Sequence, residues 1–157
     1  MQIYLITVGN RMPSWVEKGY EEFARRMPAE CSLNLIEITP EKRTKNMDRN
    51  RILQKEGDRI LTAIPKNTRL LALDVNGNQW STEELAFQLE NWLQDGRNIA
   101  LMVGGPDGLD IRCKERADSK WSLSRLTLPH PLVRVIVAEQ LYRAWTIIQN
   151  HPYHRGA

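Results

Sequence analysis

Residues 121–153 read WSLSRLTLPHPLVRVIVAEQLYRAWTIIQNHPY. Residues 132–149 contain neither glycine nor proline, which predicts one long helix. Pro131 suits its first position, where a missing N–H is no loss. His130 stands between two prolines, and a residue before proline is pushed out of the helical region, so we expect it to be extended. The stretch therefore predicts a rigid corner that leads into a helix.

The predicted helix is apolar on almost every side. At 100° per residue, Glu139 and Arg143 share one face with Val135 and Ile136, and Trp145 lies opposite. Such a helix must be covered on both sides. It is either a buried core helix of one chain or a helix that packs against a second subunit, and the second interpretation predicts a homodimer.

The length and composition of the chain are those of a single globular domain over residues 1–157. Hydrophobic residues make up 41% and charged residues 26%, so the chain can bury a sizeable core. A net charge of +3 permits a polyanionic partner without requiring one. Cys31 and Cys113 are too few for a disulfide framework or a zinc ribbon and fit a reducing cytosol, so we expect a cytoplasmic protein.

Neither a membrane span nor a signal peptide is visible. Residues 1–8 lack the basic start and the cleavage site of a signal peptide, and we expect a strand there. The apolar run at residues 99–103 is far shorter than the roughly 20 residues that cross a bilayer. We therefore expect no membrane partner.

Strands and helices alternate along the chain, which predicts an α/β fold with a mostly parallel sheet flanked by helices. Within residues 69–73 and 98–103, the runs 70–73 and 99–103 are apolar without alternation, as strands covered on both faces are. Ser81 and Glu84 have the spacing of a capping box, and residues 74–79 before them are expected to be a loop. The predicted strands are residues 2–8, 32–39, 69–73, 98–103 and 122–126, and the predicted helices are residues 13–27, 52–65, 81–94, 110–119 and 132–149.

Three predicted strand ends are candidate ligand sites, because ligands of open α/β sheets bind outside the carboxyl ends of strands. They are Leu73, the glycines after Val103, and residues 126–128. The sequence GGPDG at residues 104–108 is neither a GxGxxG fingerprint nor a Walker A loop, so we expect no triphosphate. It is either a tight turn that needs positive φ or a place where the backbone approaches a ligand closely.

Histidines occur only near the end of the chain. His130 is expected at a helix N-terminus, where the helix dipole disfavours the imidazolium and leaves a neutral proton acceptor. His151 and His154 have no acidic or cysteine neighbour in sequence, so we expect no metal. Residues 150–155 mix aromatic and cationic groups that can anchor an unpaired RNA base, or they are a frayed terminus.

Residues 41–51 are strongly basic. Such a charge run is either a solvated surface or a contact for an RNA phosphate backbone.

Long motifs in the chain resemble the ribosomal RNA large-subunit methyltransferase H family of the SPOUT superfamily. They are VGNRMPSWV, LIEI, VGGPDGL, WSLSRLTLPHPLVRVIVAEQLYRAW and NHPYHR, and together they cover essentially the whole chain. The resemblance implies a C-terminal trefoil knot and a homodimer. It implies transfer of a methyl group from S-adenosyl-L-methionine to N3 of a pseudouridine in 23S rRNA within the assembled 70S ribosome.

The resemblance also assigns roles to residues at matching positions. Cofactor contacts are implied for Leu73, Gly104, Gly105, Leu123, Ser124, Arg125, Leu126, Thr127 and Leu128; catalytic roles for His130, Arg143, Tyr153 and Arg155; and RNA contacts for Lys42, Arg43, Lys45 and His154.

The implied chemistry needs mostly positioning, because the cofactor carries its own electrophilic methyl group. His130 or the tail would accept the N3 proton, and Arg143 or Arg155 would stabilise the negative charge on the flanking carbonyl oxygens. Two alternatives stay open at this point. One is an RNA-binding factor without catalysis, which would not need a small-molecule pocket, and the other is an enzyme of the same fold with another RNA acceptor.

Overall fold

The structure, a computed structural model, describes residues 1–156. Within these residues five strands form one parallel sheet in the order β2-β1-β4-β3-β5. The predicted α/β fold with a parallel sheet flanked by helices is thereby confirmed. The elements are β1 (Gln2–Val8), α1 (Ser14–Ala24), η1 (Ala29–Cys31), β2 (Ser32–Ile38), α2 (Arg49–Ala63), β3 (Thr68–Gln79), α3 (Thr82–Asp95), β4 (Asn98–Val103), α4 (Ile111–Arg116), β5 (Ser119–Ser122), α5 (His130–Ile148) and η2 (Pro152–Gly156).

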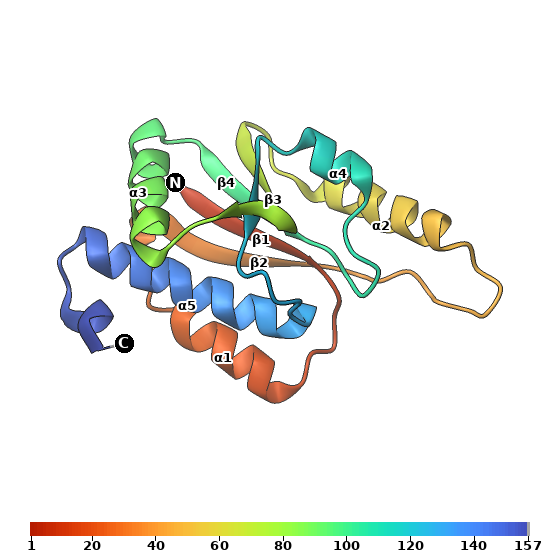
Figure 1. Ribbon diagram of the computed structural model, residues 1–157, viewed down its shortest axis with the longest axis horizontal. Helices are drawn as coiled ribbons and strands as arrows, with labels where there is room; N and C mark the ends of the chain where they lie inside the picture. Colours follow the sequence, from red (N-terminus) through yellow and green to blue (C-terminus); the bar gives the residue numbers. More distant parts are fainter. Residues whose placement is uncertain (157) are drawn as a thin grey trace.

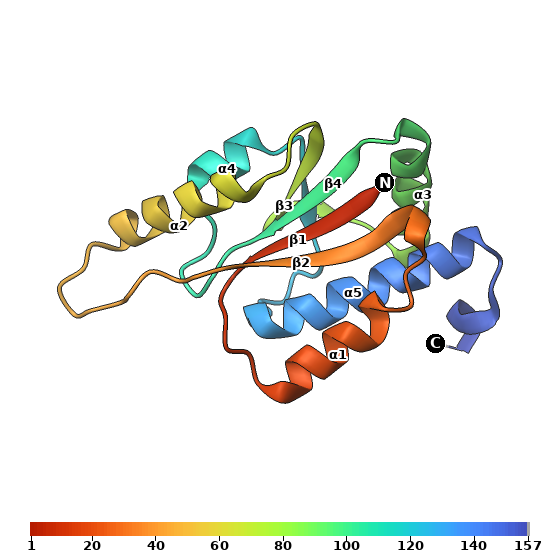
Figure 2. The same ribbon diagram turned by 180° about the vertical axis from the view of Figure 1, so that it is seen from behind.

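Two helical layers cover the sheet. Helices α1, α3 and α5 lie on one face, and α2 and α4 lie on the other (Figures 1 and 2). Leu71 and Leu101 pack with the first layer, and Ala72 and Met102 pack with the second. Successive side chains of β3 and β4 are buried on opposite faces, which explains their uninterrupted apolar sequences.

Strands β3 and β5 differ from the prediction at the edge of the sheet. Residues 74–79, expected to be a loop, continue β3, because Asn78 pairs with Trp121 after a register shift that follows Leu73. Strand β5 is Ser119–Ser122 and not residues 122–126. Gly77 allows this pairing, since a Cβ there would stand 2.7 Å from the backbone carbon of Lys120.

Helix α5 begins at His130, one residue before Pro131, which was expected at its first position. Leu132 and Val133 both donate backbone hydrogen bonds to the carbonyl oxygen of Pro129, at 3.0 and 3.2 Å. Pro129 is therefore the extended cap residue, with φ −65° and ψ 139°, and His130 is the first helical residue. The prediction of an extended His130 is wrong because the first turn closes on Pro129.

Helix α5 packs beside α1 and α3 in the layer that covers one face of the sheet (Figure 1). Val137 and Leu141 are fully buried, so one side of α5 belongs to the core of the chain. Val135 and Ile136 remain partly exposed.

The end of the chain is an ordered element. Residues Pro152–Gly156 form the 3-10 helix η2, which packs on α5. The ring of Tyr153 lies edge-on against Tyr142, with centroids 4.7 Å apart. The interpretation of residues 150–155 as a frayed terminus is therefore wrong for the residues described. Across residues 1–156, no helix is long and apolar enough to cross a membrane.

Candidate functional site

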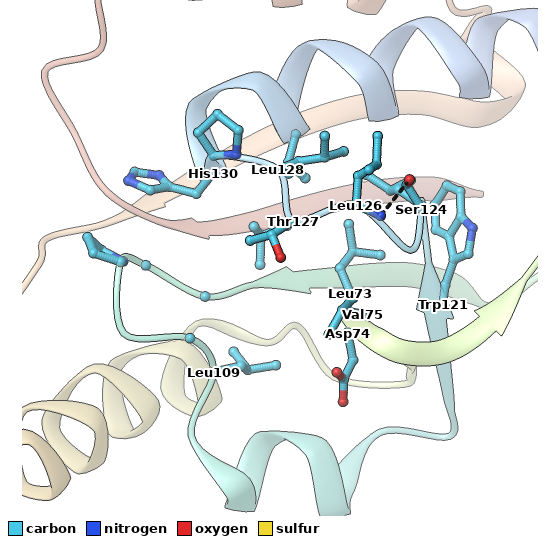
Figure 3. Close-up of a pocket in the computed structure, with 18 of the residues that line it drawn as sticks. Leu73, Asp74, Val75, Leu109, Trp121, Ser124, Leu126, Thr127, Leu128 and His130 are labelled. Carbon is cyan, nitrogen blue, oxygen red and sulfur yellow. Dashed lines mark hydrogen bonds between the residues drawn. The ribbon is translucent and has the colours of Figure 1, made fainter.

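A pocket of about 710 Å³ lies at the carboxyl end of β4, beside residues 73–75 in the middle of β3 and next to β5 (Figure 3). It has the size of a typical small-molecule site. Three segments that are distant in sequence form it: residues 73–75, 103–109 and 121–131, joined by Lys114 and Val133. Of the residues predicted to contact the cofactor, eight line it, and Arg125 is exposed outside it. The eight are Leu73, Gly104, Gly105, Leu123, Ser124, Leu126, Thr127 and Leu128.

The segment Gly104–Gly108 is a tight turn, here named the glycine turn. Gly108 donates a backbone hydrogen bond of 3.0 Å to the carbonyl oxygen of Gly105, and φ of Gly108 is +89°. A Cβ on Gly104 would overlap the carbonyl group of Gly108. The interpretation of GGPDG as a tight turn that needs positive φ is confirmed at Gly108. The turn also lines the pocket, and close approach of its backbone to a ligand stays a prediction.

Residues 123–129 form a loop where a strand was predicted to continue. Ser122 is the last strand residue, and its hydroxyl donates a hydrogen bond of 3.0 Å to the carbonyl oxygen of Ser124. The backbone N–H of Leu126 donates to the Ser124 hydroxyl at 2.9 Å (Figure 3). These bonds curl the chain away from the sheet, and the loop forms a wall of the pocket.

An ion pair at the pocket was not predicted from the sequence. Asp74 and Lys114 both line the pocket, and Lys114 Nζ lies 3.6 Å from Asp74 Oδ2. Asp74 directly follows a predicted strand end, and this position could have identified it from the sequence as a pocket residue. Lys114 belongs to α4, and only the fold brings it to this place.

His130 lines the pocket from the start of α5. Its Nδ1 is buried and has no hydrogen-bond partner among the described residues. Burial, followed by the nearby guanidinium groups of Arg134 and Arg43, lowers the pKa of His130. The neutral imidazole expected from the sequence is thus favoured, and burial is the main cause.

Arg134, one turn after His130, is a second residue that the sequence did not reveal. Only 2% of it is exposed. Its guanidinium donates to the carbonyl oxygen of Gly9 at 2.9 Å and to Glu37 at 2.8 Å. From sequence alone, a charged residue on a mostly apolar helix is expected at the surface. Arg134 is instead buried and joins α5 to the ends of β1 and β2.

The remaining predicted catalytic residues lie at the other end of α5. Tyr153 donates to Glu139, and the guanidinium of Arg143 stands 5.0 Å from the centre of the Tyr153 ring. Arg143 follows His130 by thirteen helical residues, which is about 20 Å along the axis. A single chain therefore does not bring Arg143, Tyr153 and Arg155 to its own pocket.

Residues predicted to contact RNA fall into two groups. Lys42 and Lys45 are exposed in the loop before α2. Arg43, in the same loop, is instead paired with Glu56 and Asp107. His154 sits at the tail, with Nδ1 3.4 Å from the hydroxyl of Thr146.

Comparison with known proteins identifies relatives over the full length. A family model described as predicted SPOUT methyltransferase matches residues 1–154. A protein of Methylococcus capsulatus named ribosomal RNA large subunit methyltransferase H is 63% identical over 155 residues, covering 99% of this chain and 100% of the relative. A protein of the same name from Marinomonas sp. is 57% identical, with the same coverage of both chains.

Solved structures support the fold. A putative methylase family protein from Neisseria gonorrhoeae matches with a TM-score of 0.53 and 13% identity, covering 89% of this chain and 81% of that one. A probable methylase family protein from Haemophilus influenzae matches with the same TM-score and identity, covering 97% and 69%. The family model and the two close relatives establish that the chain belongs to the ribosomal RNA large-subunit methyltransferase H family of SPOUT methyltransferases.

Proposed function

We propose that this protein transfers a methyl group from S-adenosyl-L-methionine to N3 of a pseudouridine in 23S rRNA, on the assembled 70S ribosome in the cytoplasm. The observation that carries the proposal is the pocket of about 710 Å³, which has the glycine turn for one wall and leucine side chains for others. Relatives that are 63% and 57% identical carry the name of a ribosomal RNA methyltransferase. This pocket also favours an enzyme over an RNA-binding factor without catalysis.

The pocket residues suit the cofactor. Leu73, Leu109 and Leu128 offer apolar surface for the adenine ring, and the glycine turn offers backbone groups that no side chain covers. We assign cofactor contacts to Leu73, Gly104, Gly105 and the pocket-lining residues of the loop that begins at Leu123. When bound, the cofactor supplies a methyl group on a sulfonium, so the protein's task is to align the acceptor nitrogen with it.

His130 is proposed as the proton acceptor. A pseudouridine N3 must lose its proton as the new bond forms, and a neutral imidazole at the pocket wall can take it directly or through one water. The lowered pKa of His130 keeps the imidazole neutral and available near pH 7.

A second copy of the chain is proposed to complete the site. Arg143 lies ten helical residues, about 15 Å along the axis, beyond Val133, the last residue of α5 that lines the pocket of its own chain. Tyr153 lies beside Arg143, and both Tyr153 and Arg155 belong to η2. A homodimer that uses the partly exposed side of α5, including Val135 and Ile136, would bring the tail of one protomer to the pocket of the other. Tyr153 would then stack on the extruded base, and Arg143 or Arg155 would bind a carbonyl oxygen. The C-terminal segment of each protomer is proposed to form the trefoil knot of the superfamily.

Recognition of the ribosome is proposed to rest on shape as well as charge. Lys42, Lys45 and His154 are the candidate RNA contacts, but a net charge of +3 gives modest attraction for bare RNA. The assembled ribosome, which presents a shaped surface around the pseudouridine, is therefore the expected substrate.

The experiment uses 70S ribosomes from a strain that lacks this methyltransferase. The protein and labelled S-adenosyl-L-methionine are added, and mass spectrometry of 23S rRNA locates the methyl group. We expect methylation of a single pseudouridine in 70S ribosomes and little in protein-free RNA. Ribosome binding without binding of S-adenosylhomocysteine would instead favour a non-catalytic factor. Methylation of another nucleotide would keep the enzyme and change the acceptor.

A further inference from the structure

The glycine turn is held from outside by the basic segment, residues 41–51. Arg43 Nε donates a hydrogen bond of 2.8 Å to Asp107 Oδ2. Arg49 Nε lies 3.5 Å from the other carboxylate oxygen of Asp107, and Arg49 Nη2 donates to the Asp107 carbonyl oxygen at 3.3 Å. Two segments more than fifty residues apart in sequence are thus tied together at one aspartate.

Asp107 is the member of the glycine turn that does not line the pocket. The other four residues of the turn do: Gly104, Gly105, Pro106 and Gly108. The turn therefore has an inner side toward the pocket and an outer carboxylate toward the basic segment. The turn is short and closed by its own hydrogen bond. A displacement of Asp107 therefore also displaces the residues of the turn that line the pocket.

Arg43 is itself fixed from behind. Its Nη2 lies 3.3 Å from Glu56 Oε1, and Glu56 is only 2% exposed. The backbone N–H of Glu41 donates to the same carboxylate at 3.1 Å. A buried carboxylate is strongly destabilising without a cation, so Glu56 keeps Arg43 in place. A Cβ added to Gly105 would stand 3.7 Å from Arg43 Nη2, which places the guanidinium directly behind the pocket wall.

We propose that Arg43 and Asp107 form a clamp that positions the glycine turn and thereby sets the affinity for the cofactor. The inference rests on the proposed function, because it takes the pocket as the cofactor site. Arg43 is then a positioning residue on the cofactor side and not a contact for RNA phosphate. Its charge is matched by two carboxylates, whereas Lys42 and Lys45 have exposed ammonium groups for phosphates.

The clamp predicts a salt effect on cofactor binding. The side chains of Arg43 and Asp107 are 31% and 27% exposed, so added salt reaches and weakens their attraction. S-adenosylhomocysteine is a zwitterion without net charge and is a suitable probe, since its own attraction to the protein depends little on salt.

The decisive variant is Asp107→Asn. Asparagine suits a turn as well as aspartate does, and the change leaves Arg43 paired with Glu56. We expect calorimetry to show S-adenosylhomocysteine binding about tenfold more weakly than in the wild type, with a smaller dependence on NaCl. Asp95→Asn is the matched control, because it breaks a similar 2.8 Å pair with Arg97 that does not line the pocket. Its affinity should equal that of the wild type.

A second comparison separates the two roles of the basic segment. Arg43→Gln should weaken S-adenosylhomocysteine binding, and combining it with Asp107→Asn should add little, because both changes open the same clamp. Lys45→Gln, which removes one exposed charge from the same loop, should leave cofactor affinity unchanged and weaken ribosome binding. If Arg43→Gln fails to fold because Glu56 is left unpaired, Asp107→Asn decides alone.

Unchanged affinity and unchanged salt dependence in Asp107→Asn would overturn the clamp and leave the cofactor site standing. An effect of Arg43→Gln on ribosome affinity alone would also overturn it and return Arg43 to the RNA contacts. Failure of the wild-type protein to bind S-adenosylhomocysteine would contradict the proposed function itself, and the clamp with it.

Discussion

Tyr153 donates a hydrogen bond of 2.9 Å to Glu139, the same carboxylate that pairs with Arg143 at 2.9 Å. Two proposed acceptor-side residues are therefore held by one helical glutamate. Burial, followed by Glu139, raises the pKa of Tyr153, so its phenol remains a protonated donor at physiological pH. The tail is fastened to α5 before any partner arrives.

Variants at Tyr153 should separate anchoring from catalysis. Tyr153→Phe loses one hydrogen bond and keeps the ring contact with Tyr142, so the free energy of unfolding should fall by about 1 kcal/mol. Tyr153→Ala also loses the ring and should destabilise by about 2 kcal/mol or more. Thermal melting measures both.

Arg155→Ala, which changes an exposed side chain, should leave the melting temperature near wild type while methyl transfer falls. If Tyr153→Phe, Tyr153→Ala and Arg155→Ala all had the same melting temperature, the packing of Tyr153 would contribute nothing to the stability of the fold.

Gly104→Ala should abolish cofactor binding. The new Cβ would overlap the carbonyl group of Gly108, so the glycine turn must open and the pocket wall must change shape. Calorimetry with S-adenosylhomocysteine measures the loss. Gly96→Ala is the control, since Gly96 caps α3 with φ +83° and a side chain there should lower stability by about 1 kcal/mol without touching the pocket. Wild-type affinity in Gly104→Ala would mean that the cofactor does not contact this turn.

The protein should lose stability as the pH falls below 6.5, in part through His130. The pKa of His130 is lowered from 6.5 in the folded protein, mainly by burial, so the unfolded chain binds more protons between the lowered value and 6.5. The free energy of unfolding therefore decreases as the pH drops through that window. The contribution of the neutral His130 to that free energy is fully present above pH 6.5. Denaturant unfolding at a series of pH values measures this. His130→Gln should remove that part of the slope, and His151→Gln should leave it in place.

Methyl transfer should show the same titration. If His130 accepts the N3 proton, the acid limb of the rate profile has its midpoint below 6.5, because the imidazole stays neutral down to its lowered pKa. Single-turnover rates on 70S ribosomes measure the limb. A midpoint above 6.5 would assign the proton transfer to another group.

Mixed dimers should recover activity from two inactive proteins. His130→Ala removes a pocket residue, and Arg155→Ala removes a residue of the tail. If the tail of one protomer serves the pocket of the other, random mixing should restore about a quarter of wild-type activity, because about half of the dimers then hold one intact site. Sedimentation should show twice the 18.2 kDa chain mass. A monomer at micromolar concentration, or no recovery on mixing, would contradict the shared site.

The sequence predicted the centre of the sheet better than its edge. Strands β1 and β4 have the predicted bounds, because each is rich in apolar residues that suit a strand covered on both faces. Residues 74–79 read DVNGNQ, which has the composition of a loop, yet they extend β3 because β5 supplies a partner. Residues 122–128 alternate as a strand does, but they lack a partner beyond Ser122. Pairing at an edge depends on a neighbour that local composition does not reveal.

The candidate site likewise contains residues that could be predicted from the sequence and residues that could not. Parallel strands bring their carboxyl ends together, so Leu73, Gly104 and Leu128 were predictable as neighbours from the strand pattern. Lys114 and Arg134 were not, since their positions depend on how α4 and α5 lie on the sheet. The separation of Arg143 from His130 follows from helix geometry once α5 is known to be unbroken.

The strand order has a consequence for how the chain folds as it is made. The first strand lies beside the fourth, and the backbone N–H of Gln2 bonds to Asn98, 96 residues later. At roughly 5–20 residues per second, several seconds pass between synthesis of these two strands. During that time the side of β1 that will face β4 has no partner, so the centre of the sheet closes late, after most of the nascent chain has been synthesised.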